Sequence, residues 1–180
     1  MSDQAERLYE RLLVLRCQTG DKSAYRELVA RFGPRLHYFL RKLSPRADRA
    51  DDLAQEVWLE VLRQLPRLKD AGAFTTWLYR IAHGKAMLDA RRNGRAPATT
   101  PDVDQVAGKE EQFSPEDAAQ IHAALDRLEP PHREVLVLRF LEELSYDEIG
   151  QIVGCPVGTV RSRIHFAKAA LQRLLRRDQN

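Results

Sequence analysis

Hydrophobic residues recur every three or four positions through most of the chain, which is the period of an amphipathic helix. In the first half this period predicts four helices, at residues 6–16, 22–42, 50–65 and 73–92. The third has the most regular apolar stripe, formed by Leu53, Val57, Val61 and Leu65 and widened by Trp58 and Leu62. In the first helix we expect an inward face of Leu8, Leu12, Leu13 and Leu15. Within the second, Gly33-Pro34 predicts a bend or a division, because proline removes a backbone hydrogen bond.

The helical pattern stops at residues 95–113, where proline, glycine and acidic residues replace large apolar groups. Such a segment buries too little surface to order itself, which predicts a flexible linker. Beyond it, Ser114-Pro115 favours a helix start, because serine caps helices and proline fits their first turn. Four short helices are predicted, at residues 115–128, 131–141, 145–153 and 157–176. We therefore expect an all-α chain of two small helical domains, residues 1–94 and 114–180, joined by that linker.

The last two of these helices carry the signature of a helix-turn-helix. Ser145 and Glu148 form a capping box, Gly154 suits a left-handed helix end, and Pro156 opens the next helix. In the final helix, the spacing predicts an inward face of Val160, Ile164, Ala167 and Leu171. The outer face then holds Gly158, Thr159, Arg161, Ser162, His165 and Lys168. Small, hydroxyl and guanidinium groups near a helix start suit contacts with DNA bases and phosphates. The alternative is an ordinary helical hairpin with a solvated basic face.

Composition narrows the class of protein. The net charge of +3 is only a mild preference for polyanions, although six of the last twenty residues are arginine or lysine. Cys17 and Cys155 are far apart, and the five histidines show no metal-ligand spacing. We find no nucleophile motif, so we expect neither an enzyme nor a cofactor, metal or small-molecule substrate. The N-terminus lacks a signal-peptide core and no apolar run approaches a membrane span, which predicts a cytoplasmic protein without membrane insertion.

Two features of the first half are candidates for function. Asp51, Asp52, Gln55 and Glu56 are turned away from the apolar stripe of their helix. Acids near a helix start also stabilise the helix by themselves, so that simpler interpretation remains open. The second feature is an aromatic and basic cluster at residues 74–85. Aromatic groups beside cations hold unstacked bases, but aromatics at helical spacing also fill protein cores, and the residues alone leave both possibilities open.

Four motifs together resemble the extracytoplasmic-function (ECF) sigma factors of bacterial RNA polymerase. They are Asp-Asp-Leu-Ala-Gln-Glu-Val-Trp at 51–58, Phe-Thr-Thr-Trp-Leu-Tyr-Arg-Ile-Ala at 74–82, Arg-Glu-Val-Leu-Val-Leu-Arg-Phe at 133–140 and Gly-Thr-Val-Arg-Ser-Arg-Ile at 158–164. The match runs from about residue 13 to 175, with the motifs in the family's order. The resemblance implies a region-two domain and a region-four domain, which bind core polymerase and direct promoter-specific transcription initiation.

The resemblance also implies roles for single residues. Core polymerase would be bound by Asp51, Asp52, Gln55 and Glu56. The −10 promoter element would be opened and read by Leu68, Trp77, Tyr79, Arg80 and His83. The −35 element would be read by Gly158, Thr159, Arg161, Ser162, Arg163, His165 and Lys168. The chain departs from the family pattern at Gly84, where asparagine is frequent, and at Leu68, where an aromatic residue is frequent.

Further partners follow from the same resemblance. The linker would pass through the polymerase channel, and an anti-sigma factor is an expected inhibitor. The main alternative is a conventional helix-turn-helix regulator that binds an operator as a dimer and senses a ligand through its N-terminal half. Such a protein should carry a dimerisation element or ligand pocket, and we see no heptad seam in the sequence.

Overall fold

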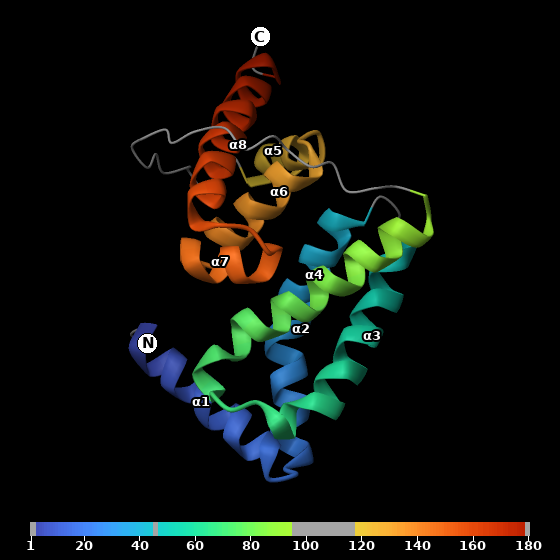
Figure 1. The fold of residues 1–180 in the computed structure, drawn as a ribbon, viewed down its shortest axis with the longest axis vertical. Helices are drawn as coiled ribbons and strands as arrows, with labels where there is room; N and C mark the ends of the chain where they lie inside the picture. Colours follow the sequence, from blue (N-terminus) through green and yellow to red (C-terminus); the bar gives the residue numbers. More distant parts are fainter. Residues whose placement is uncertain (1–2, 45–46, 95–117, 179–180) are drawn as a thin grey trace. The chain divides into compact units, whose positions relative to one another are not determined.

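The computed structural model describes residues 3–44, 47–94 and 118–178, and within these ranges the chain forms helices and turns without a β-strand. It divides into two compact units, Met1–Arg92 and Asn93–Asn180, hereafter the first and second unit (Figure 1). The all-α fold class is therefore confirmed. The predicted linker at 95–113 and the predicted cap at Ser114 lie outside the described residues. In the described parts of the chain, no helix combines the length and apolarity needed to cross a membrane.

The first unit is built around its second helix. It comprises α1 (Asp3–Gln18), α2 (Lys22–Leu43), α3 (Ala47–Gln64) and α4 (Phe74–Arg92), with two 3-10 turns, η1 (Leu65–Arg67) and η2 (Ala71–Ala73), between α3 and α4. Helix α2 contacts α1, α3 and α4. Aromatic edges fill the interfaces, with Phe32 against Phe74 and Phe39 against Tyr79, each at 5.1 Å between ring centres. This core holds the α3–α4 connection in place.

Helix α2 runs through Pro34 as one helix, so of the predicted bend or division the division is wrong. The side chain of Asp21 caps the helix by accepting hydrogen bonds from the backbone N–H groups of Ser23 and Ala24, at 2.8 and 3.0 Å. Buried residues on both sides of the proline, including Phe32 and Leu36, hold the helix against its neighbours. Tertiary packing therefore outweighs the local cost of proline.

The predicted inward face of α1 is wrong for three of its four residues. Leu8, Leu12 and Leu15 are exposed, whereas Leu13 and Val14 are buried. A leucine-rich helix has more than one apolar face, and its neighbours decide which one is covered. The predicted stripe from Leu53 on α3 to Leu65 at the start of η1 is buried, but Leu62 beside it is exposed.

The second unit is organised around its last helix. It comprises α5 (Ala118–Asp126), α6 (Pro130–Leu136), a π-helical segment η4 (Val137–Leu141), α7 (Tyr146–Val153) and α8 (Val157–Asp178). Helix α8 contacts α5, α6 and α7. Its predicted inward face is confirmed, because Val160, Ile164, Ala167 and Leu171 are all buried.

The turn between α7 and α8 has the predicted helix-turn-helix chemistry. The Ser145 hydroxyl accepts from the Glu148 N–H, and the Glu148 carboxylate accepts from the Ser145 N–H at 2.8 Å, which completes the capping box. Gly154 ends α7 with a left-handed backbone, at φ 70°. Gly150, inside α7, is needed for a different reason. A Cβ atom there would lie 2.9 Å from the carbonyl oxygen of Cys155, so only glycine allows the turn to fold this closely.

Candidate nucleic-acid interface

A hollow of about 700 Å³ lies in the first unit, where the end of α3 and the following loop meet α4. Its lining consists of Glu60, Arg63, Gln64, Arg67, Leu68, Lys69, Trp77 and Arg80. Four of these eight side chains are cations and one is an indole. The hollow therefore combines positive charge with an aromatic surface, and it brings together three residues predicted to read the −10 element, Leu68, Trp77 and Arg80.

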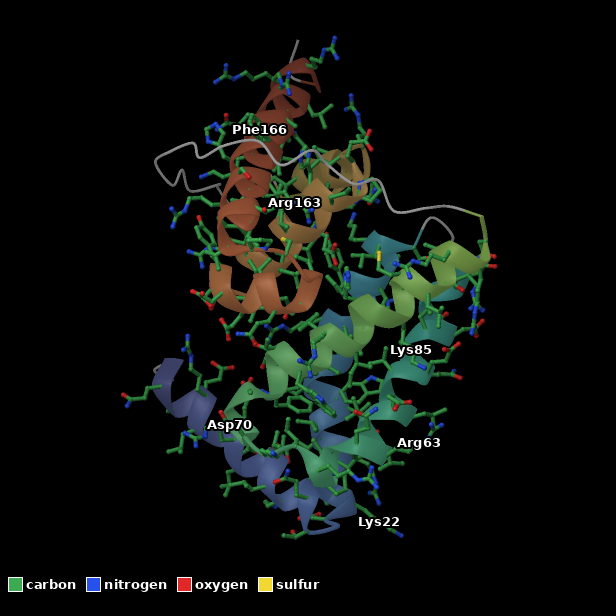
Figure 2. The ribbon with its side chains drawn as sticks, viewed as in Figure 1. Lys22, Arg63, Asp70, Lys85, Arg163 and Phe166 are labelled. Atoms are coloured by element: carbon green, nitrogen blue, oxygen red, sulfur yellow. The ribbon has the colours of Figure 1, made fainter. Side chains whose placement is uncertain are left out.

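The charge of the hollow is only partly compensated within the unit. Glu60 is the acid in its lining, and its carboxylate accepts from Arg63 at 3.4 Å and from the Gln64 amide. Figure 2 labels Arg63 on α3 and Asp70 in the loop that leads to α4. Cations at the end of a helix also oppose the negative end of its dipole, so they are stable there before any ligand binds. The net positive charge suits a phosphate backbone.

Trp77 is positioned by the core of the unit. Its ring lies 6.0 Å from the ring of Phe74, tilted by 48°, and Phe74 is itself buried against Phe32. The indole is partly exposed on the side of the hollow. A tryptophan anchored on one side in this way loses little side-chain freedom when a flat ring stacks on the other. The geometry is that of a stacking surface for an unpaired base.

The loop between α3 and α4 is held by two polar side chains. The Gln18 amide, at the end of α1, donates to the carbonyl oxygens of Leu65 and Leu68, at 3.0 and 2.7 Å. Asp70 accepts from the Gly72 N–H at 2.8 Å and so caps η2. Sequence reasoning did not identify Gln18, and no local signal could have found it, because its partners lie 47 and 50 residues away.

Two of the residues predicted to contact the −10 element lie elsewhere. Tyr79 is fully buried and stands edge-on to Phe39, so it supports the core and offers no surface to DNA. His83 is partly buried and is not among the residues that line the hollow. Sequence reasoning missed Arg63, Arg67 and Lys69 in the lining. Their clustering at one helix end was the available signal.

The four residues predicted to dock on polymerase lie on the outside of α3, and three of them contact basic side chains within the unit. Asp51 is 2.8 Å from the His37 ring, Asp52 is 2.8 Å from Arg49, and Glu56 is 3.7 Å from Lys85. Gln55 is exposed. Exposed pairs of this kind contribute little stability, and a carboxylate can accept several hydrogen bonds at once. The acids therefore remain accessible to a partner.

A further ion pair links α3 to α4 beside these acids. The Arg49 guanidinium donates to one carboxylate oxygen of Asp89 from two nitrogens, at 3.1 and 2.7 Å. The hydrogen bond with Asp89 raises the pKa of Arg49, and the charge of Asp89 adds to the effect. Asp89 therefore connects α4 to α3.

The second candidate surface is the outward side of α8. Gly158 and Arg161 are exposed, while Thr159, His165 and Lys168 are partly exposed. The Lys168 ammonium lies 5.9 Å from the ring centre of Phe140. These five predicted residues share the part of α8 that follows the turn, where a helix can enter a DNA groove.

Two other residues predicted on this surface are held differently. Ser162 is buried, and its hydroxyl donates to the helix's own carbonyl oxygens at Gly158 and Thr159, at 3.2 and 3.1 Å. The Nε of Arg163 is buried and finds no hydrogen-bond partner in the described part of the chain. Arg163 acts electrostatically on α6. Burial lowers the pKa of His132 there, and the positive charge of Arg163 lowers it further.

Comparison with known proteins places both units in one family. Residues 28–96 match the family model described as Sigma-70 region 2, and residues 118–171 match Sigma-70, region 4. The RNA polymerase sigma-H factor of Pseudomonas aeruginosa is 37% identical over 180 residues, covering 91% of this chain and 92% of that protein. The ECF RNA polymerase sigma-E factor of Escherichia coli is 34% identical over 192 aligned residues, covering 96% of this chain and all of that protein.

Solved structures agree with the sequence comparisons. The chain resembles CnrH, solved in complex with the cytosolic domain of CnrY, with a TM-score of 0.68, 27% identity, and coverage of 94% of this chain and 98% of that one. It resembles the sigma factor RpoE of Bartonella quintana, solved with the anti-sigma factor NepR, with a TM-score of 0.67, 26% identity, and coverage of 84% of this chain and 96% of that one.

In the described residues, no group of three or more His, Cys, Asp or Glu side chains could hold a metal ion.

Proposed function

Because this chain belongs to the extracytoplasmic-function sigma factors of RNA polymerase, we propose that it reads a promoter through two separate surfaces, the hollow on the first unit and the outward side of α8 on the second. The domains we assign to these tasks are residues 1–94 and 114–180. As an initiation factor it supplies recognition and leaves the chemistry to the polymerase, so we assign it no enzymatic activity. We assign it to the cytoplasm, where the polymerase acts.

The hollow suits a base that has left the DNA stack. The Trp77 indole offers a face for stacking, Leu68 adds an apolar wall, and Arg80 stands beside them. The remaining cations of the lining suit the phosphates on either side of that base. Tyr79 is left out of this proposed contact because it is buried.

Polymerase is needed because opening the duplex is costly. Unstacking each base step costs about a few kcal/mol. One aromatic contact contributes about 1–3 kcal/mol, which is too little to offset the cost of unstacking several steps. Asp51, Asp52, Gln55 and Glu56 supply an acidic outer face on α3 for docking on polymerase. In this scheme the large enzyme sustains the opened DNA, and the first unit selects which sequence is opened.

The second unit suits duplex DNA. Arg161 is exposed on the first turns of α8. Gly158 beside it is also exposed and, because it has no side chain, leaves the helix backbone accessible. Thr159, His165 and Lys168 extend this surface as hydrogen-bond donors. A basic helix of this kind fits the major groove, where guanidinium groups read guanine. Ser162 is left out because its hydroxyl is occupied within the helix.

An anti-sigma factor is the further partner we infer. The structure of the similar sigma factor RpoE contains the anti-sigma factor NepR. A protein inhibitor that covers one of the two surfaces would stop promoter reading without affecting the fold.

The observation that carries the proposal is the hollow that combines Trp77 with four cations, and in vitro transcription tests it. We expect specific transcripts only when the chain is combined with core polymerase. Trp77→Ala should reduce promoter opening by about 1–3 kcal/mol, and Arg161→Ala should weaken promoter binding by a similar amount where it reads a base. A template already unpaired at the −10 element should partly rescue Trp77→Ala and should not rescue Arg161→Ala.

Two results would overturn the proposal. Tight operator binding by the chain alone, without stimulation of core polymerase, would favour the dimeric regulator. Rescue of both variants by the unpaired template would show that promoter opening and upstream binding are not separate functions of the two surfaces. Trp77→Phe is the matched control, because it keeps an aromatic face and should retain most of the opening.

A further inference from the structure

Phe166 is a large apolar side chain on the outward side of α8. It is 36% exposed, although the buried face of the helix is complete without it. Its ring stands edge-on to His165, with 5.4 Å between ring centres and 79° between planes. Figure 2 shows Phe166 on α8 in the second unit. The ring packs against a neighbouring side chain of the recognition surface and stays partly open to solvent.

The position of Phe166 places it among the proposed DNA contacts. At about 100° per residue, Phe166 and His165 each point about 130° away from the mean direction of the four buried side chains, on opposite sides. It lies about 13 Å along the axis from the start of α8, on the same two to three turns as Arg161 and His165. A side chain there can reach into a major groove that is about 12 Å wide.

The immediate surroundings of Phe166 are less polar than the rest of this surface. Ser162, one turn earlier, is buried and directs its hydroxyl into the carbonyl groups of the helix. Ala169, three residues later, is exposed and carries only a methyl group. Phe166 and Ala169 therefore present carbon atoms beside the donors of Arg161 and His165, and no free hydroxyl group of Ser162 lies between them.

The major groove presents one apolar group to such a strip. Adenine, guanine and cytosine offer hydrogen-bond donors and acceptors there, whereas thymine also offers its 5-methyl group. Phe166 cannot donate or accept a hydrogen bond with its ring, so a polar base edge against it would lose its partner. We propose that Phe166 contacts the 5-methyl group of a thymine in the upstream promoter element and selects thymine at that position. This proposal rests on the proposed function of α8.

The test removes one methyl group from the DNA. Holoenzyme assembled from core polymerase and the full chain would compete for promoter duplexes in which each thymine of the upstream element is replaced, one at a time, by deoxyuridine. The wild-type chain should bind thymine roughly fourfold better than uracil at one position, which is the effect of burying about one methyl group. In the Phe166→Ala chain, this ratio should fall to about one.

Matched variants separate this contact from other effects. Phe140→Ala removes another exposed aromatic ring of the same unit and should leave the thymine-to-uracil ratio unchanged. Phe166→Leu keeps an apolar group and should retain part of the ratio. Thermal unfolding of Phe166→Ala checks that the unit is folded.

Two outcomes overturn the proposal. One is a wild-type chain that binds thymine and uracil equally at every position, and the other is a Phe166→Ala chain that keeps the full preference. Arg161→Ala is measured in the same assay. If it weakens binding while no methyl effect is seen, the proposed function of α8 stands and the role of Phe166 fails. If neither variant nor any base change has an effect, the function of α8 fails as well.

Discussion

Gln18 shows how a single side chain can prepare a distant site. Its amide connects the end of α1 to two carbonyl groups of the loop that forms one wall of the hollow. Both carbonyls belong to residues at the ends of a short 3-10 turn, Leu65 and Leu68, and the Leu65 carbonyl also accepts from the Leu68 N–H at 3.1 Å. A wall held by one glutamine can be loosened by one substitution, without changing any residue that would contact DNA.

We therefore predict that Gln18→Met weakens both stability and promoter opening. Methionine keeps the length of the side chain but removes both hydrogen-bond donors, and two partly buried carbonyls lose a partner. We expect the free energy of unfolding to fall by about 1–3 kcal/mol, measured by urea denaturation. Open-complex formation should fall as well, because Leu68 is no longer held beside Trp77.

Gln120→Met is the matched control, because Gln120 is exposed on α5 in the other unit. It should leave the stability of the first unit and promoter opening unchanged. Equal stability of Gln18→Met and the wild type would show that these two hydrogen bonds do not brace the loop.

At the scale of elements, the helix-turn-helix depends on close backbone contact between α7 and α8. Gly150 lies against the carbonyl of Cys155, and this contact determines how tightly the turn closes. We predict that Gly150→Ala destabilises the second unit by about 1–3 kcal/mol, because a backbone atom must move to admit the new methyl group. Its binding to the upstream promoter element should weaken in parallel.

The matched control for this substitution is Gly158→Ala, at the start of α8. A Cβ atom at Gly158 would meet nothing within 4 Å, so alanine should be tolerated or should stabilise the helix slightly. Thermal unfolding measures both variants. Equal stability of Gly150→Ala and Gly158→Ala would contradict the steric argument.

Elements with local signals could be predicted from the sequence, and elements chosen by distant neighbours could not. The capping box at Ser145 and the left-handed turn at Gly154 depend on residues within a few positions, and both were predicted. The exposed face of α1 depends on what covers Leu13, and the undivided α2 depends on packing on both sides of Pro34. Local patterns do not contain this information.

The residues of the candidate site also fall into those that the sequence could predict and those that it could not. Leu68, Trp77 and Arg80 were predicted from family motifs and lie together in one hollow. Tyr79 belongs to the same motif but faces the core, because one residue along a helix turns a side chain by about 100°. A motif identifies a helix reliably, and only the packing of that helix decides which of its residues face outward.

At the scale of the whole molecule, the two units have separate cores and should unfold separately. This separation can be observed directly, because the chain has two tryptophans, Trp58 and Trp77, and both lie in the first unit. Tryptophan fluorescence therefore reports the first unit, whereas calorimetry detects both. Reading two promoter elements suits this arrangement, since a change in one surface need not disturb the other.

Acidification provides a test of this independence through His132, in the second unit. Burial lowers the pKa of His132, the charge of Glu129 opposes this effect, and the charge of Arg163 adds to it. The unfolded chain then binds a proton at a higher pH than the folded unit does. The contribution of His132 is therefore constant above its ordinary pKa of 6.5 and becomes destabilising as the pH falls below that value.

We predict an effect of lowering the pH from about 7.5 to about 5.5, across the ordinary titration range of histidine. The unfolding temperature of the second unit should fall. This unit gives the calorimetric transition that tryptophan fluorescence does not report. His132→Gln should reduce this acid effect, because glutamine takes up no proton in either state. The transition reported by Trp58 and Trp77 should respond to pH equally in both chains, since His132 lies outside that unit. An undiminished acid effect in His132→Gln would assign the pH dependence to another group. A difference between the two chains in the fluorescence transition would show that the units are energetically coupled.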